Sequence, residues 1–187
     1  MTIFNDSFLK PPRANELEIT CFGPGYGECI VVHIPGAGWG VIDSCVHEVG
    51  KSVKSLPLDY LLGILKEPYP KLAFVILTHP HEDHYRGMDV LIREYPGGVE
   101  RVCRYGGEGV RELKTYINQR KLAYQSVLPG LIDVFKAMSE SKTRGSQLRR
   151  LNEMSLILDL KEANVEGYGK TDIKLLALSP SSQAVTK

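Results

Sequence analysis

A continuous apolar run in residues 71–79, KLAFVILTH, is the feature that most restricts what this chain can fold into. Its residues do not alternate between apolar and polar, as they do in a strand with one face exposed to solvent. We therefore expect a β-strand that is covered on both faces. The chain has 187 residues, which is enough for one domain with a hydrophobic core.

The segments around this run predict a mixture of strands and helices. The opening strands are joined by short Gly-Pro turns, which predicts an antiparallel meander. Leucines at helical spacing and a later amphipathic segment predict helices that alternate with strands. We expect strands at 17–22, 28–36, 39–43, 71–79, 97–105 and from 171 onwards, helices at 55–67 and 84–96, and broken helical structure over 108–158.

Composition narrows the class of protein. Hydrophobic residues make up 43% and charged residues 24%, as in ordinary globular domains. No apolar run approaches the roughly 18 residues that cross a bilayer, and no signal peptide is visible. We expect a cytoplasmic protein without membrane contact. The four cysteines show no CxxC pairing and are expected to be reduced thiols packed in or near the core, at Cys21, Cys29, Cys45 and Cys103.

Charge is distributed unevenly along the chain. Residues 101–150 contain 11 Lys or Arg against 4 Asp or Glu, although the whole chain has a formal net charge of only +1. This basic middle could face a phosphate-rich substrate or nucleic acid. It could equally be the solvated surface of helices, and no recognition motif decides between the two.

Histidines are crowded directly after the apolar run. His79, His81 and His84 fall within six residues, with Asp83 between the last two. Side chains at i and i+2 of an extended segment lie on one face, so His79 and His81 can reach one cation. Asp83 and His84 offer a carboxylate and an imidazole to a second cation. Such donors suit zinc, manganese or iron, and the alternative is a histidine-rich surface loop without metal.

The segment THPHEDHYRG, residues 78–87, resembles the signature of the metallo-β-lactamase-like hydrolases. The preceding CFGPGYGECIVVHI and GWGVIDSC fit the meander with which that family opens. The glycine-rich first turn and the later ALSPS are most similar to the hydrolase domain of bacterial DNA-uptake competence proteins. The resemblance covers about residues 17–182. It implies an α+β fold, namely a four-layer αββα sandwich with a site for two metal ions, expected to be zinc.

The resemblance also implies roles for individual residues. His79 and His81 would bind the first metal, and Asp83 and His84 the second, with Asp83 also counted as catalytic. Asp43 would hydrogen-bond to one of the metal ligands and orient it, although it could instead cap the end of a strand. The implied activity is metal-dependent hydrolysis of a small molecule, a phosphodiester or a nucleic acid. The alternative is a degenerate, non-catalytic module that binds or regulates a partner.

The family's ligand set needs further residues that this sequence does not supply. The other histidines are His33, expected to pack in the core or at a sheet edge, and His47, expected to be solvated. After a leader at 1–16, we therefore interpret 17–187 as the N-terminal part of such a domain: an expressed fragment, a truncated gene product or half of a split protein. We expect negligible hydrolysis, and self-association or a partner chain at the exposed sheet edge.

Overall fold

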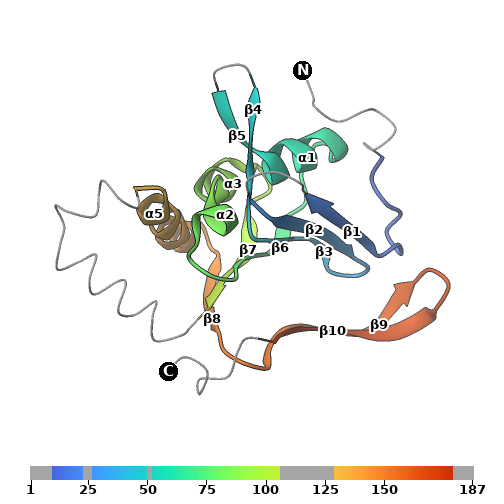
Figure 1. Cartoon of the computed structure of the whole chain (residues 1–187). Helices are drawn as coiled ribbons and strands as arrows, with labels where there is room; N and C mark the ends of the chain where they lie inside the picture. Colours follow the sequence, from blue (N-terminus) through green and yellow to red (C-terminus); the bar gives the residue numbers. More distant parts are fainter. Residues whose placement is uncertain (1–9, 23–26, 50–51, 106–128, 179–187) are drawn as a thin grey trace.

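The computed structural model describes residues 10–22, 27–49, 52–105 and 129–178. The fold is α+β, with helices against one face of a mixed sheet and a two-stranded ribbon against the other (Figure 1). The elements are β1 (Glu18–Phe22), β2 (Cys29–Ile34), β3 (Gly38–Ile42), β4 (Val46–Val49), β5 (Ser52–Ser55), α1 (Leu56–Ile64), β6 (Leu72–Leu77), α2 (Glu82–Tyr85), α3 (Met88–Glu94), β7 (Val99–Tyr105), α5 (Pro129–Thr143), β8 (Gln147–Leu151), β9 (Ser155–Val165) and β10 (Gly169–Ala177).

The main sheet has six strands in the order β1-β2-β3-β6-β7-β8. The meander β1-β2-β3 is antiparallel, as the turns between these segments predict. From β3 onwards the neighbours are parallel, with Ile42 opposite Ile76. The C-terminal ends of β3, β6, β7 and β8 therefore meet at one edge of the sheet, which is where ligands commonly bind in αβ folds.

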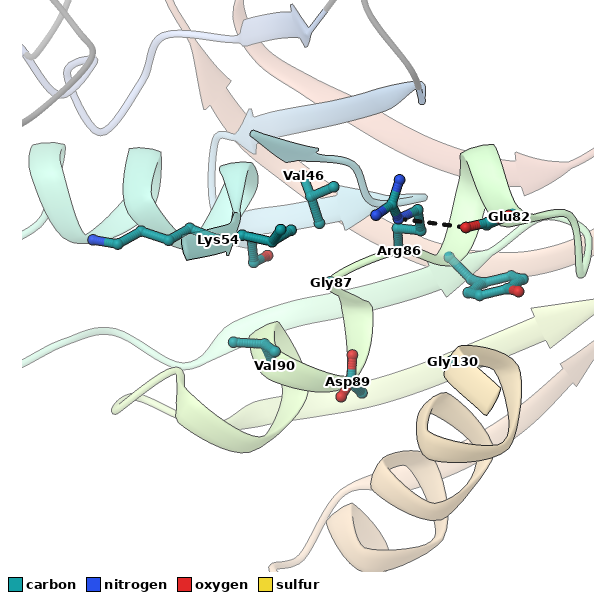
Figure 2. A pocket seen from close by; sticks show the side chains of 11 residues that line it. Val46, Lys54, Glu82, Arg86, Gly87, Asp89, Val90 and Gly130 are labelled. Atoms are coloured by element: carbon teal, nitrogen blue, oxygen red, sulfur yellow. Dashed lines mark ion pairs between the residues drawn. The ribbon is translucent and has the colours of Figure 1, made fainter. Parts of the chain in front are cut away.

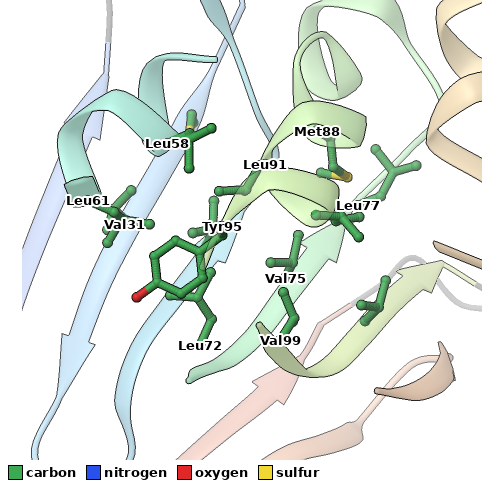
Figure 3. Close-up of a cluster of buried hydrophobic side chains, with 14 of the residues drawn as sticks. Val31, Leu58, Leu61, Leu72, Val75, Leu77, Met88, Leu91, Tyr95 and Val99 are labelled. Carbon is green, nitrogen blue, oxygen red and sulfur yellow. The ribbon is translucent and has the colours of Figure 1, made fainter. Parts of the chain in front are cut away.

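Strand β6 is fully buried, which confirms the expectation of a strand covered on both faces. Leu72, Val75 and Leu77 point into the core beneath the helices, where Leu61 of α1 and Leu91 of α3 pack against the sheet (Figure 3). Burial of so many aliphatic side chains stabilises the layer, because each contributes roughly 1.5–3 kcal/mol. This core fixes the position of the loop that follows β6.

The opposite face of β6 is covered by the ribbon of β9 and β10. Phe74 and Ile76 lie in a second core with Ile157 and Leu158 of the ribbon. The ribbon also meets the segment before β1, where the amide of Glu166 donates to the carbonyl of Asn15 at 2.7 Å. The layers that the structure describes are therefore helices, a sheet and a second, smaller sheet.

The helix expected at 84–96 is two helices, α2 and α3. Gly87 has φ +76° and separates them. A left-handed residue ends the first helix and redirects the chain, and glycine adopts that conformation without a steric penalty. Met88, Leu91 and Ile92 of this segment are buried against the sheet. The helix expected at 55–67 is present as α1 but ends earlier, at Ile64.

The expectation of helical structure over 108–158 is wrong for its C-terminal part. Residues 129–143 form α5, but β8 and the start of β9 follow as strands. Residues 106–128 lie outside the described part of the chain. The hairpin of β4 and β5 was not predicted at all, because its two strands are short and mostly polar.

Two expectations about single side chains also need correction. His47 is not solvated: its Nε2 lies 3.0 Å from Asp59 Oδ2, and only 14% of its side chain is exposed. The β4–β5 hairpin brings it against the start of α1. Cys21 is exposed rather than packed, whereas the other three cysteines are buried and all four are free thiols. His33 is buried as expected, with Nδ1 2.7 Å from the carbonyl oxygen of Glu16.

None of the helices in the described segments is both long enough and apolar enough to cross a membrane. The edges of the six-stranded sheet are β1 and β8. Strand β8 has mostly exposed side chains, including two arginines, and charged side chains at an edge disfavour pairing with another chain. Association through a sheet edge stays a prediction.

Candidate metal centre

The candidate centre lies at the C-terminal edge of β3 and β6. Asp43 follows β3, Thr78 and His79 follow β6, and His84 belongs to α2. Two backbone hydrogen bonds join these segments, from the amide of Asp43 to the carbonyl of Ile76 and from the amide of Ser44 to the carbonyl of His84, both at 2.8 Å. Residues distant in sequence are thus held together by a rigid edge.

Asp43 is the central acceptor of this cluster. It is 6% exposed and has φ +58°, a conformation that aspartate tolerates better than most residues. Its Oδ1 accepts the backbone amide of Thr78 at 2.8 Å, and its Oδ2 accepts the Thr78 hydroxyl at 2.6 Å. The same Oδ2 lies 2.8 Å from Nδ1 of His84. The buried carboxylate is therefore satisfied by donors on two segments.

The contact with Asp43 determines how His84 is oriented. A carboxylate accepts hydrogen bonds, so Nδ1 of His84 donates in this contact, and in the neutral imidazole Nε2 keeps the free lone pair. This Nε2 lies 3.5 Å from Oδ2 of Asp83. A carboxylate that holds one imidazole nitrogen while the other is presented is the usual arrangement behind metal-binding histidines.

Thr78 extends the influence of Asp43 to His79. The single hydroxyl proton of Thr78 is donated to Asp43, and the hydroxyl oxygen lies 3.0 Å from Nδ1 of His79. Nδ1 of His79 must then be the donor of that contact, which leaves its Nε2 free as well. Sequence reasoning did not single out Thr78. A threonine at the last position before a histidine cluster was the available signal.

The imidazole of His79 lies against those of His81 and His84. The ring centroids of His79 and His84 are 3.7 Å apart, and those of His79 and His81 are 4.7 Å apart. Burial lowers the pKa of His79, and the neighbouring rings of His84 and His81 lower it further. The neutral imidazole, which is the form that binds metal, is therefore favoured at this position.

The donor chemistry fits a metal ion better than the present arrangement of the donors does. Imidazole and carboxylate groups with fixed tautomers suit zinc. Within the described residues, however, no group of three or more His, Cys, Asp or Glu side chains is arranged to hold a metal ion. The rings of His79 and His84 are in contact at an interplanar angle of 48°, so a shared cation would require side-chain rotation. Asp83, with 46% of its side chain exposed, has room to move.

A backbone hydrogen bond fixes the main chain of the segment that carries the histidine cluster. The amide of Glu28 donates to the carbonyl of Asp83 at 2.9 Å. Gly27 allows this approach, because a Cβ there would lie 2.8 Å from Cβ of Cys45 and 3.0 Å from that carbonyl oxygen. The metal-ligand candidates therefore differ from a loose surface loop, since their main chain is fixed although some side chains can rotate.

Two cavities lie near the cluster, and one of them is lined by cluster residues. One, of about 440 Å³, is lined by His79 and Thr78 at one end and otherwise by apolar side chains from the sheet and the ribbon. The other, of about 250 Å³, lies between the β4–β5 hairpin and helices α2, α3 and α5 (Figure 2). In this second cavity Arg86 lies 3.5 Å from Glu82, so these two flanking residues form an ion pair with each other.

Together these features define an α+β protein with a histidine-rich candidate metal centre at a sheet edge. The structure brings Asp43, His79, His81, Asp83 and His84 to that edge. His33 and His47 form separate contacts with Glu16 and Asp59. Comparison with the known protein families found none that matches this chain, and no curated protein matches it.

Proposed function

We propose that this chain is the metal-binding part of a metal-dependent hydrolase of the metallo-β-lactamase-like class. The observation that carries the proposal is the hydrogen bond from His84 to Asp43, together with the Thr78 contact that fixes His79 in the same tautomer. A surface loop without metal gives no reason for a buried carboxylate that orients one imidazole directly and a second through Thr78, each by its Nδ1.

In this proposal His79 and His81 bind one zinc ion, and Asp83 and His84 bind a second. Zinc would supply a strongly nucleophilic hydroxide at neutral pH and would polarise the bond to be cleaved. Asp43 keeps His84 in the binding tautomer, and Thr78 does the same for His79. Manganese or iron would suit the same donors.

The proposed fold is the αββα sandwich of that class. The described layers, helices over a sheet over a ribbon, support the first three of its four layers. The proposed substrate is a phosphodiester, on the strength of the basic residues beyond β6. Fold alone does not choose a substrate, because one scaffold hosts many chemistries.

A non-catalytic binding module is the second candidate. The absence of a preformed three-donor group among the described residues favours it, as does the direct contact between the rings of His79 and His84. In such a module the histidines would bind no metal, and the affinity for the partner would not depend on them. His81→Ala would then leave partner binding unchanged.

Competition with a chromophoric chelator would test the proposal by measuring zinc affinity. We expect His84→Ala and His81→Ala to weaken zinc binding at least 10-fold. His47→Gln is the matched control, since His47 pairs with Asp59 and not with the cluster. Equal affinity in all variants would refute the metal site. Hydrolysis of a generic phosphodiester by the zinc-loaded protein would then separate the enzyme from the binding module.

A further inference from the structure

A row of residues crosses the sheet from the candidate centre to its edge. Leu77 at the end of β6 is opposite Arg104 of β7, and Arg104 is opposite Arg150 of β8. Register partners point to the same face, and Leu77 lies in the core beneath the helices. Both arginines therefore lie on the helix-covered face, at the edge where His79 leaves the sheet.

The two arginines line one cavity of about 230 Å³. Its wall on the helix side comes from α5, where the guanidinium of Arg104 lies 5.8 Å from the ring centroid of Phe135. A cation over an aromatic face is held in place without being neutralised. The cavity is lined by Val102, Arg104, Phe135, Met138, Ser139, Leu148, Arg149 and Arg150.

Other arginines nearby form ion pairs within the described part of the chain. Arg93 pairs with Glu140 at 2.9 Å, and Arg101 pairs with Glu100 at 2.6 Å. Among the described residues, no carboxylate forms an ion pair with Arg104 or Arg150. Burial lowers the pKa of Arg104, and the charge of Arg150 lowers it further. Arg104 is partly exposed and Arg150 is exposed, so two like charges lie side by side on neighbouring strands, and an anion between them would relieve their repulsion.

The basic residues of the middle of the sequence lie in different settings: Lys136 and Lys142 are on helix α5, and four others are outside the described residues. Arg101, Arg104, Arg149 and Arg150 lie on neighbouring strands and not on a solvated helix. Their alternation along β7 and β8 puts Arg104 and Arg150 on the helix face as register partners, with Arg149 of the next position also at the cavity lining. Strand spacing puts the Cα of Arg150 on the order of 12 Å from that of His79.

We propose that Arg104 and Arg150 form a binding site for a phosphate group at the same sheet edge as the histidine cluster. Arginine is suited to this task because its planar guanidinium donates two parallel hydrogen bonds to phosphate oxygens. The proposal deepens the proposed function and rests on it for the statement that this phosphate belongs to the substrate. A substrate that reaches both sites would place one phosphate at the histidine cluster and another between the arginines. A chain with several phosphodiester bonds has this property.

The test measures binding without metal, so that it does not depend on the zinc site. Pyrophosphate is titrated by calorimetry, and a short fluorescent single-stranded oligonucleotide by anisotropy, both in EDTA. The variants are R104Q/R150Q and the charge-matched control K170Q/K174Q, which removes two exposed lysines from the ribbon. R104K/R150K retains the charge but not the paired donors. Circular dichroism checks that each variant folds.

The proposal predicts that R104Q/R150Q weakens binding on the order of 10-fold or more, because charge-assisted hydrogen bonds are lost. R104K/R150K should fall between this variant and the wild type, and the control should match the wild type. Arginine-dependent binding of pyrophosphate identifies free phosphate compounds as sufficient, whereas binding of the oligonucleotide alone identifies a nucleic-acid backbone.

Unchanged binding in R104Q/R150Q, or an equal loss in the control, would overturn the site. So would an affinity that is insensitive to salt between about 50 and 200 mM, since phosphate contacts weaken with salt. If zinc binding fails while arginine-dependent phosphate binding persists, the hydrolase proposal falls and the phosphate site stands. The reverse result removes the phosphate site alone.

Discussion

Asp43 and His84 are 41 positions apart in sequence, yet Oδ2 of Asp43 lies 2.8 Å from Nδ1 of His84. The contact joins the end of β3 to the short helix after β6. It orients one imidazole directly, and through Thr78 the same carboxylate orients a second. Asp43 therefore organises the histidine cluster although it does not itself present a free donor atom.

Asp43→Asn should weaken zinc binding by about 10- to 100-fold, the usual effect of losing a partner behind a metal ligand. The asparagine amide brings donor hydrogens to positions where Thr78 and His84 already donate. Asp89→Asn is the control, because Asp89 pairs with Arg93 on α3. An Asp43→Asn variant that binds zinc as the wild type does would show that this carboxylate only caps the strand.

Gly87→Ala should destabilise the protein more than Gly98→Ala, although both glycines have positive φ. A Cβ at Gly87 would lie 2.8 Å from Cγ1 of Val46, whereas Gly98 has open space around it. Each alanine variant costs about 1–2 kcal/mol of backbone strain. Gly87→Ala should lose roughly 1–3 kcal/mol more through overpacking. Denaturant unfolding measures both, and equal losses would contradict the packing of Gly87 against the β4–β5 hairpin.

Sequence patterns predicted the buried centre of this fold better than its periphery. Strand β6 was recognisable because burial on both faces demands an uninterrupted apolar run. Strand β8, QLRRL, is an edge strand with mostly exposed side chains, so no alternation reveals it. The break at Gly87 was missed because the residues on both sides of it have helical spacing. The tertiary position of an element, more than its local propensity, determined which elements were visible.

The ring of Phe74, the register partner of Gly40 on β6, leaves no space for a side chain at Gly40. A Cβ at Gly40 would lie 2.1 Å from Cζ of Phe74, which is fully buried. We expect Gly40→Ala to destabilise the protein by about 1–3 kcal/mol. Adding Phe74→Leu should recover part of that loss in a double-mutant cycle of unfolding free energies. Strict additivity of the two losses would show that these residues do not touch.

The sequence predicted those parts of the candidate site whose residues are close together in the chain. The histidines and Asp83 lie within one short segment, so their spacing alone indicated a metal site. Asp43 was inferred only from a resemblance, since 41 residues separate it from His84. The pairing of Arg104 with Arg150 was not predictable, because it depends on the register of β7 and β8. Spacing cannot show such a contact.

Cysteine reactivity should follow burial in the folded protein. Cys21 is exposed, whereas Cys103 is buried and burial raises its pKa to about 11. Only the thiolate reacts with iodoacetamide, so at pH 8 Cys21 should be alkylated first and Cys103 should be protected. Mass spectrometry of tryptic peptides measures the order. In urea all four thiols should react, and rapid alkylation of Cys103 without denaturant would contradict the second core.

Long-range 1H–15N NMR of the five histidines, recorded before and after addition of zinc, tests the central claim most directly. The account predicts that His79 and His84 carry their proton on Nδ1 without metal. Zinc should then shift Nε2 of both residues and the ring of His81, while His33 and His47 stay unchanged. Nε2-protonated His79 and His84, or spectra that do not respond to zinc, would contradict the metal centre.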